Sequence, residues 1–126
     1  MKSYEVELNG ETIKLRLRSV DICELEEKNK KSIIDLMKDV SQTTIIMFLM
    51  YMRRFEIPNY SKKEASELYD KFIDNDYTMQ DVIFNVIYEG LVVSGVMTKQ
   101  ELERLKEIVG LQEKKTKTAI EELSQK

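Results

Sequence analysis

The sequence has no histidine and no tryptophan, and only one cysteine, one proline and four glycines among its 126 residues. Without histidine, the chain has no imidazole base for Ser-His catalysis and no imidazole ligand for a metal. The single thiol, Cys23, forms neither an internal disulfide nor a zinc site, and we expect it to be a buried structural thiol in a reducing compartment. Such a scarcity of turn-forming residues favours a mostly helical fold.

Neither the charge nor the hydropathy of the chain is extreme. Lys and Arg number 20 against 23 Asp and Glu, which gives a net charge of −3. Nucleic-acid-binding domains usually present a basic face, so we expect no nucleic-acid partner. The longest apolar run, residues 45–52, is far shorter than the roughly 20 residues that cross a bilayer, and residues 1–10 lack the apolar stretch of a signal peptide. These absences predict a protein with no membrane partner.

The residues that are present predict a β-hairpin at the start of the chain. Apolar and charged residues alternate over 3–8 and again over 11–17, on either side of an Asn-Gly pair. This pair favours a two-residue turn because both of its residues tolerate positive φ. In the register that follows, the numbers of paired residues sum to 19, so Glu5 lies opposite Lys14.

After the hairpin the apolar period becomes helical, and Ser or Thr residues precede the periodic segments as predicted caps. The caps are Ser19, Ser32, Ser61, Thr78 and Thr98. The predicted helices cover 20–29, 33–40, 42–55, a segment opened by Ser61, 79–94 with Gly95 behind it, and a segment between Thr98 and Gly110. The segment behind Ser61 has an apolar stripe of Ala65, Leu68, Tyr69, Phe72 and Ile73.

These elements predict an α+β, mostly helical domain in which five or six α-helices follow the N-terminal β-hairpin. We expect residues 1–110 to form this single domain. Residues 111–126 are a polar, Lys/Glu-rich C-terminal tail.

No residue cluster has the pattern of a catalytic or metal site. Asp74, Asp76 and Thr78 have the initial spacing of a calcium loop, but the glycine that such a loop needs at its sixth position is Met79. The glutamates of residues 24–27 are followed at once by lysines, which is typical of a solvated helix face. We therefore expect no enzyme, no metal and no cofactor.

Two predicted helices, 44–55 and 79–94, are apolar on nearly every face. Such a helix is either central to its domain or has one face in contact with a partner. Methionine-rich surfaces suit adaptable binding of apolar segments. The candidate interface residues are Ile46, Met47, Met50, Ile83, Ile87 and Leu91.

The sequence resembles the tail assembly chaperones of long-tailed siphophages and their prophages, over roughly residues 3–110. The opening SYEVELNGETIKLRLRS, the following DICELEEKNKKSIIDLMKDVSQ and the later TMQDVIFNVIYEGLVVSG are similar to the family's hairpin and helices. The matching residues of the first two segments are Asn9, Gly10, Lys14, Leu15, Arg16, Leu17, Glu24, Leu25, Glu26, Ile34, Asp35, Leu36 and Met37. The family often has a glycine after its E-L-E helix, where this chain has Asn29-Lys30.

The resemblance implies a non-catalytic protein of the bacterial cytoplasm that is absent from the mature virion. Members of the family form homo-oligomers and keep the tape measure protein soluble while the tail tube polymerises around it. A small helical DNA-binding or regulatory protein, and another phage structural adaptor, are the alternative interpretations.

The resemblance also implies a longer form of the protein, because many members of the family append a second domain by ribosomal frameshifting. Residues 113–115 are Glu-Lys-Lys. If the codons are GAA-AAA-AAG, the messenger RNA contains a run of adenines at this point. On such a run two tRNAs can move back by one base and pair again, which shifts the reading frame by −1. The extension of such a form would contact the tail tube protein.

Overall fold

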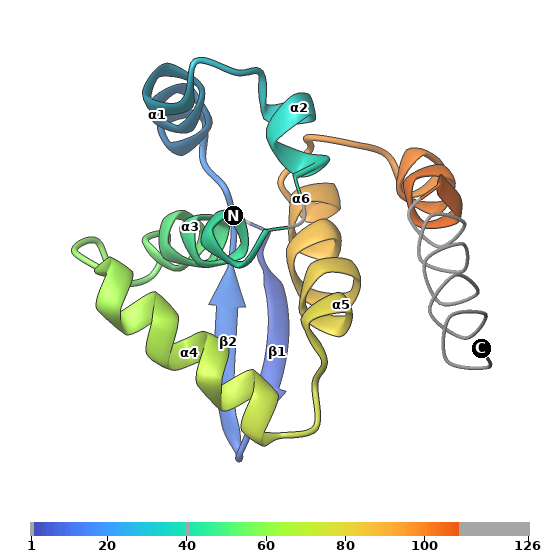
Figure 1. The fold of residues 1–126 in the computed structure, drawn as a ribbon. Coiled ribbons are helices and arrows are strands. Elements are labelled where there is room, and N and C mark those ends of the chain that lie inside the picture. The colour runs from blue at the N-terminus through green and yellow to red at the C-terminus, as the bar shows by residue number, and fades with distance from the viewer. Residues whose placement is uncertain (1, 40, 109–126) are drawn as a thin grey trace, which may run out of the picture. The chain divides into compact units, whose positions relative to one another are not determined.

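A computed structural model describes residues 2–39 and 41–108 of the chain. The N-terminal hairpin consists of β1 (Tyr4–Leu8) and β2 (Glu11–Leu15), which pair in an antiparallel two-stranded sheet (Figure 1). The pairs run from Tyr4 with Leu15 to Leu8 with Glu11, and Glu5 lies opposite Lys14. The predicted register is therefore confirmed.

The hairpin turn has the backbone conformation that an Asn-Gly pair favours. Asn9 has φ of 53° and Gly10 has φ of 78°, both in the left-handed region that a tight turn of this kind requires. Val6 and Ile13 are buried, and Glu5 and Lys14 on the other face are exposed. One face of the hairpin is thus apolar and must pack on helices, since a lone hairpin is marginal in water.

Helices make up most of the rest of the described chain (Figure 1), so the predicted α+β, mostly helical fold with an N-terminal hairpin is confirmed. The elements are α1 (Ser19–Asn29), α2 (Ile33–Met37), α3 (Gln42–Arg53), α4 (Lys62–Asp74), α5 (Met79–Val82), the π-helical segment η1 (Ile83–Ile87) and α6 (Tyr88–Val93). Residues 99–108 are also helical.

Most of the predicted caps are confirmed. The side chains of Ser32, Ser61 and Thr78 each accept a hydrogen bond from the backbone N–H three residues later, at 3.2, 3.1 and 3.1 Å. Thr98 does the same for Glu101 at 3.1 Å. These bonds satisfy donors that the first helical turn leaves without partners, which is why Ser and Thr mark the starts so well.

The predicted cap at Ser19 is wrong, because α1 begins one residue earlier. Arg18 is the N-cap, and its backbone N–H and guanidinium both donate to the carboxylate of Asp21 at 2.9 to 3.1 Å. Asp21 is buried, and it raises the pKa of Arg18 through this hydrogen-bonded ion pair. Charge-assisted hydrogen bonds from both the backbone and the side chain of Arg18 stabilise the helix start more than one serine hydroxyl does.

Helix α2 ends at Met37 rather than at residue 40 as predicted. Asp39 explains the early end, because its carboxylate accepts from the Ser41 N–H at 3.1 Å and from the Thr44 hydroxyl at 3.0 Å. These bonds lower the pKa of Asp39. Asp39 thus organises the start of α3 instead of continuing α2.

The predicted single α-helix over 79–94 is also corrected. The helical run from Met79 to Val93 contains the π-helical turn Ile83–Ile87 in its middle. A π turn inserts one residue and rotates everything after it relative to an ordinary α-helix. The Tyr4 hydroxyl donates to the Asn85 carbonyl inside this turn at 2.8 Å.

Helix α3 occupies the centre of the compact unit Met1–Val96, where it packs against α4, η1 and β2 (Figure 1). Arg16 N–H extends β2 by donating to the Met52 carbonyl at 3.0 Å. Ile45, Leu49 and Met52 are completely or almost completely buried. Helix α3 is apolar on nearly every face because other elements of the domain surround it.

The second compact unit begins at Met97. The predicted division between residues 110 and 111, and the polar tail behind it, lie outside the described residues. Within the part of the chain that the structure describes, no helix has the length and apolarity to span a membrane.

Candidate functional site

Four of the six candidate interface residues are buried inside the domain. Ile46, Ile83, Ile87 and Leu91 have exposed fractions of 9%, 7%, 2% and 0%. Ile83 and Ile87 line a small hollow of about 10 Å³ together with residues of α2 and α3. These four side chains therefore stabilise the domain itself and present little surface to a partner.

Met47 and Met50, the other two candidates, are half-buried on α3. The Met47 sulfur accepts a hydrogen bond from the Asn29 side chain of α1 at 3.4 Å, so Met47 faces α1. Ile83 and Ile87 lie against α3 through Ile45 and Phe48. The structure thus separates the six residues into an internal group and a pair of partly exposed methionines.

Helices α1 and α2 each expose one large apolar side chain. Val20 of α1 is 61% exposed and Ile34 of α2 is 43% exposed. Cys23 of α1 is exposed, so the expectation of a buried thiol is wrong. Position 23 is on the outer side of α1, whereas Asp21 and Leu25 supply its buried residues. A short helix packed on one side leaves such positions in solvent.

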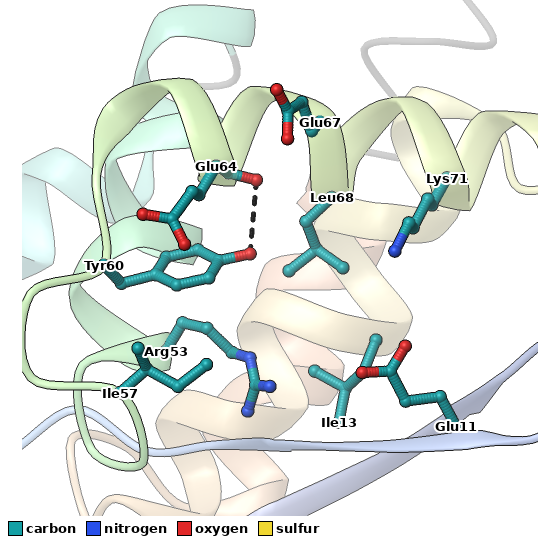
Figure 2. A pocket seen from close by; sticks show the side chains of 9 residues that line it. All are labelled: Glu11, Ile13, Arg53, Ile57, Tyr60, Glu64, Glu67, Leu68 and Lys71. Carbon is teal, nitrogen blue, oxygen red and sulfur yellow. Dashed lines mark hydrogen bonds between the residues drawn. The ribbon is translucent and has the colours of Figure 1, made fainter.

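A larger hollow of about 220 Å³ lies between β2, the end of α3 and α4, and sequence reasoning did not find it (Figure 2). Its walls combine apolar side chains with five charged ones. The lining residues are Glu11, Ile13, Arg53, Ile57, Tyr60, Glu64, Glu67, Leu68 and Lys71. This mixture is what a small binding site offers: apolar area with a few polar groups.

Arg53 is the unusual residue of this hollow, because it is charged and only 7% exposed. Its Nη1 donates to Glu56 Oε2 at 2.7 Å and to the Lys14 carbonyl at 3.3 Å. The guanidinium lies 5.8 Å from the centre of the Tyr60 ring. Burial raises the pKa of Tyr60, whose hydroxyl donates to the Glu64 carbonyl at 3.2 Å.

The position of Arg53 in the sequence indicates this site, although the amino-acid composition does not. Arg53 follows Leu49 by four positions, so the two residues lie on the same face of α3, and Leu49 is completely buried. A charge on an apolar helix face needs partners in the fold.

The clustered glutamates of α1 make contacts within the domain. Glu24 pairs with Lys28 at 2.9 Å, and the pKa of Glu24 is lowered mainly by that pair. Glu26 accepts from the Ile33 N–H at 2.9 Å, which ties α1 to α2. Among residues 2–39 and 41–108, no group of three or more acidic or cysteine side chains is arranged to hold a metal.

Comparison with known proteins gives no relatives for this chain: no family model, no curated protein and no solved structure matches it.

Proposed function

We propose that this protein is a tail assembly chaperone of a siphophage or prophage, which binds the tape measure protein and keeps it soluble until the tail tube forms around it. The similarity of the hairpin and the helices behind it to that family supports the proposal more than any other observation. In this proposal the protein acts in the bacterial cytoplasm, as a homo-oligomer, and leaves before the virion is complete.

Two features of the described chain are compatible with binding of apolar segments. Met47 and Met50 are partly exposed on α3, and unbranched thioether side chains adapt to irregular partners. Val20 and Ile34 add exposed apolar area on α1 and α2. An amphipathic helix of a long client is the kind of partner that such side chains accommodate.

Coexpression tests the proposal directly. Under this proposal a tape measure protein is encoded beside this chain. That protein is produced alone, with this chain, and with an unrelated small acidic protein as a control. We expect this chain to raise the soluble fraction of the tape measure protein and to co-purify with it. Equal solubility in all three cases, without co-purification, would contradict a chaperone role.

The longer form is part of the same proposal, and its extension would contact the tail tube protein. Glu113, Lys114 and Lys115 lie outside the described residues, so the nucleotide sequence decides this point. The proposal requires AAA at codon 114 and a −1 frame that stays open. An AAG codon there, or an early stop in the −1 frame, excludes a shift at this site.

A further inference from the structure

We propose that the hollow between β2, α3 and α4 binds one aliphatic carboxylate, with Arg53 as the anion-binding group and Lys71 as a second cation. The carboxylate is either the chain terminus or an acidic side chain of a peptide. This inference rests on the geometry of the hollow and does not depend on the proposed chaperone function.

The guanidinium of Arg53 has donors left for a ligand. Its side chain is 9% exposed, and its hydrogen bonds to Lys14 and Glu56 both use Nη1. The Arg53 guanidinium also interacts with the Tyr60 hydroxyl, and this interaction lowers the pKa of Tyr60 but only partly offsets the effect of burial. Figure 2 shows the guanidinium extending into the hollow. A guanidinium carries five N–H donors in a planar fork, a geometry that matches a carboxylate.

The walls around Arg53 suit a short aliphatic stem. Ile13 and Leu68 are buried, and Ile57 is 39% exposed at the edge. The Tyr60 ring forms a further wall, with its hydroxyl already donated to the Glu64 carbonyl. A volume of about 220 Å³ is below that of drug-sized pockets, so a ligand the size of one amino acid fits best.

Two cations line the hollow, Arg53 and Lys71, and each can contact a carboxylate. Figure 2 shows the Lys71 ammonium directed into the hollow and the Glu67 carboxylate directed away from it. The Glu64 carboxylate is held by the backbone and hydroxyl of Ser61 at 3.2 and 3.0 Å. Figure 2 shows the Glu11 carboxylate beside Ile13 and directed into the hollow, where its charge opposes phosphate and other multiply charged anions more strongly than a single carboxylate.

Three matched probes test the inference by NMR titration of the whole chain. N-acetyl-leucine has a terminal carboxylate, N-acetyl-glutamic acid α-amide has a side-chain carboxylate, and N-acetyl-leucine amide has none. We expect at least one acid to shift the Arg53 Nε–H resonance and to bind about tenfold or more tightly than the amide, because charge-assisted hydrogen bonds are lost in the amide. The tighter acid identifies the source of the carboxylate. Equal shifts with all three probes, or no shift with any, overturn the inference.

Variants place the binding on Arg53. Lys71 is exposed, so Lys71→Gln leaves the fold intact, and we expect it to weaken the acid several-fold. Glu56→Gln removes the carboxylate that competes for the guanidinium and should tighten binding by a similar factor. Glu5→Gln, which removes a charge from the outer face of β1 away from the hollow, is the control and should change little. Unchanged affinity in both test variants, or equal changes in the control, contradicts the assignment.

Discussion

Tyr88 shows how one buried polar group ties two elements of the domain together. Its side chain is 1% exposed, and its hydroxyl donates to the Met37 carbonyl of α2 at 2.6 Å. Burial raises the pKa of Tyr88 to about 12. The neutral form is therefore the one that the folded state requires, and α2 depends on it for a fixed position beside α6.

Replacement of Tyr88 by Phe has a pH-dependent effect. Below pH 10 we expect the variant to be less stable by about 1 kcal/mol or somewhat more, because the Met37 carbonyl loses its donor. The unfolded phenol ionises near pH 10, whereas the folded one stays protonated to about 12, so wild type loses up to about 3 kcal/mol as pH rises through this window. The Tyr88→Phe variant has no such loss, because the phenylalanine ring carries no ionisable group. Urea unfolding of both proteins from pH 8 to 11.5 checks this, and a gap that stays constant with pH would contradict it.

Lys30 occupies a backbone conformation that lysine rarely adopts. It caps α1 in the left-handed region, with φ of 52° and ψ of 39°, where a side chain costs roughly 1–2 kcal/mol and glycine costs little. We expect Lys30→Gly to raise the free energy of unfolding by about 0.5–1 kcal/mol. Glu27→Gly, in the body of the same helix, is the control and should lower it by about 1 kcal/mol. Destabilisation by both variants would show that the lysine side chain matters more than the backbone.

At the scale of elements, α6 approaches the Met52 side chain of α3 at Gly90. A Cβ atom on Gly90 would overlap the terminal methyl of Met52, and Tyr4 of β1 is also nearby. Ser94, one turn later, donates its hydroxyl to the Gly90 carbonyl at 2.7 Å and accepts from the Leu17 N–H at 2.8 Å. Gly90 thus lets α6 lie against α3 and the hairpin at the same time.

A double-mutant cycle measures this contact. Gly90→Ala gains about 1 kcal/mol of helix propensity but should lose about 1–3 kcal/mol to overpacking against Met52. Met52→Ala should cost about 2–5 kcal/mol through the cavity that it leaves. In the Met52→Ala background, Gly90→Ala no longer meets the methyl and should stabilise the protein. Additive effects of the two changes in urea unfolding would contradict the direct contact.

Local chemistry determines the elements that the sequence predicts well. The hairpin register follows from the Asn-Gly turn, and the helix starts follow from hydroxyl caps, because each signal acts within a few residues. Ile73 was expected on the buried stripe of α4 but is 40% exposed. It lies one position beyond Phe72, at the edge of the stripe, and only the packing of neighbouring elements decides whether an edge position is buried.

Features that depend on tertiary contacts escape sequence reasoning. The π turn of residues 83–87 leaves the apolar pattern almost unchanged. The spacing of apolar residues therefore does not distinguish it from an uninterrupted α-helix. The burial of Ile83, Ile87 and Leu91 depends on which helices surround them. The hollow at Arg53 needs β2, α3 and α4 together, and no single segment of the sequence contains it.

At the scale of the whole molecule, the structure narrows the predicted self-association surface. Ile46, Ile83, Ile87 and Leu91 are enclosed by the domain, which leaves Met47 and Met50 as the candidates with exposed area. Met47 already contacts Asn29 of α1. Met50 is therefore the residue on which the predicted homo-oligomer is best tested.

Replacement of Met50 by Glu should weaken self-association more than folding. A charge left unpaired in an interface costs about 2–5 kcal/mol, whereas a half-buried position lets the carboxylate reach water within the monomer, where we expect a loss of roughly 1 kcal/mol. Thr43→Glu adds the same charge at an exposed position of α3 and serves as the control. Light scattering over a roughly hundredfold range of concentration should show wild type and the Thr43 variant associating alike. The Met50 variant should remain smaller, while urea unfolding shows that it is folded. A wild-type chain that stays monomeric throughout this range would contradict the prediction that α3 is an interface between copies. The partly exposed Met47 and Met50 would then face solvent in the monomer.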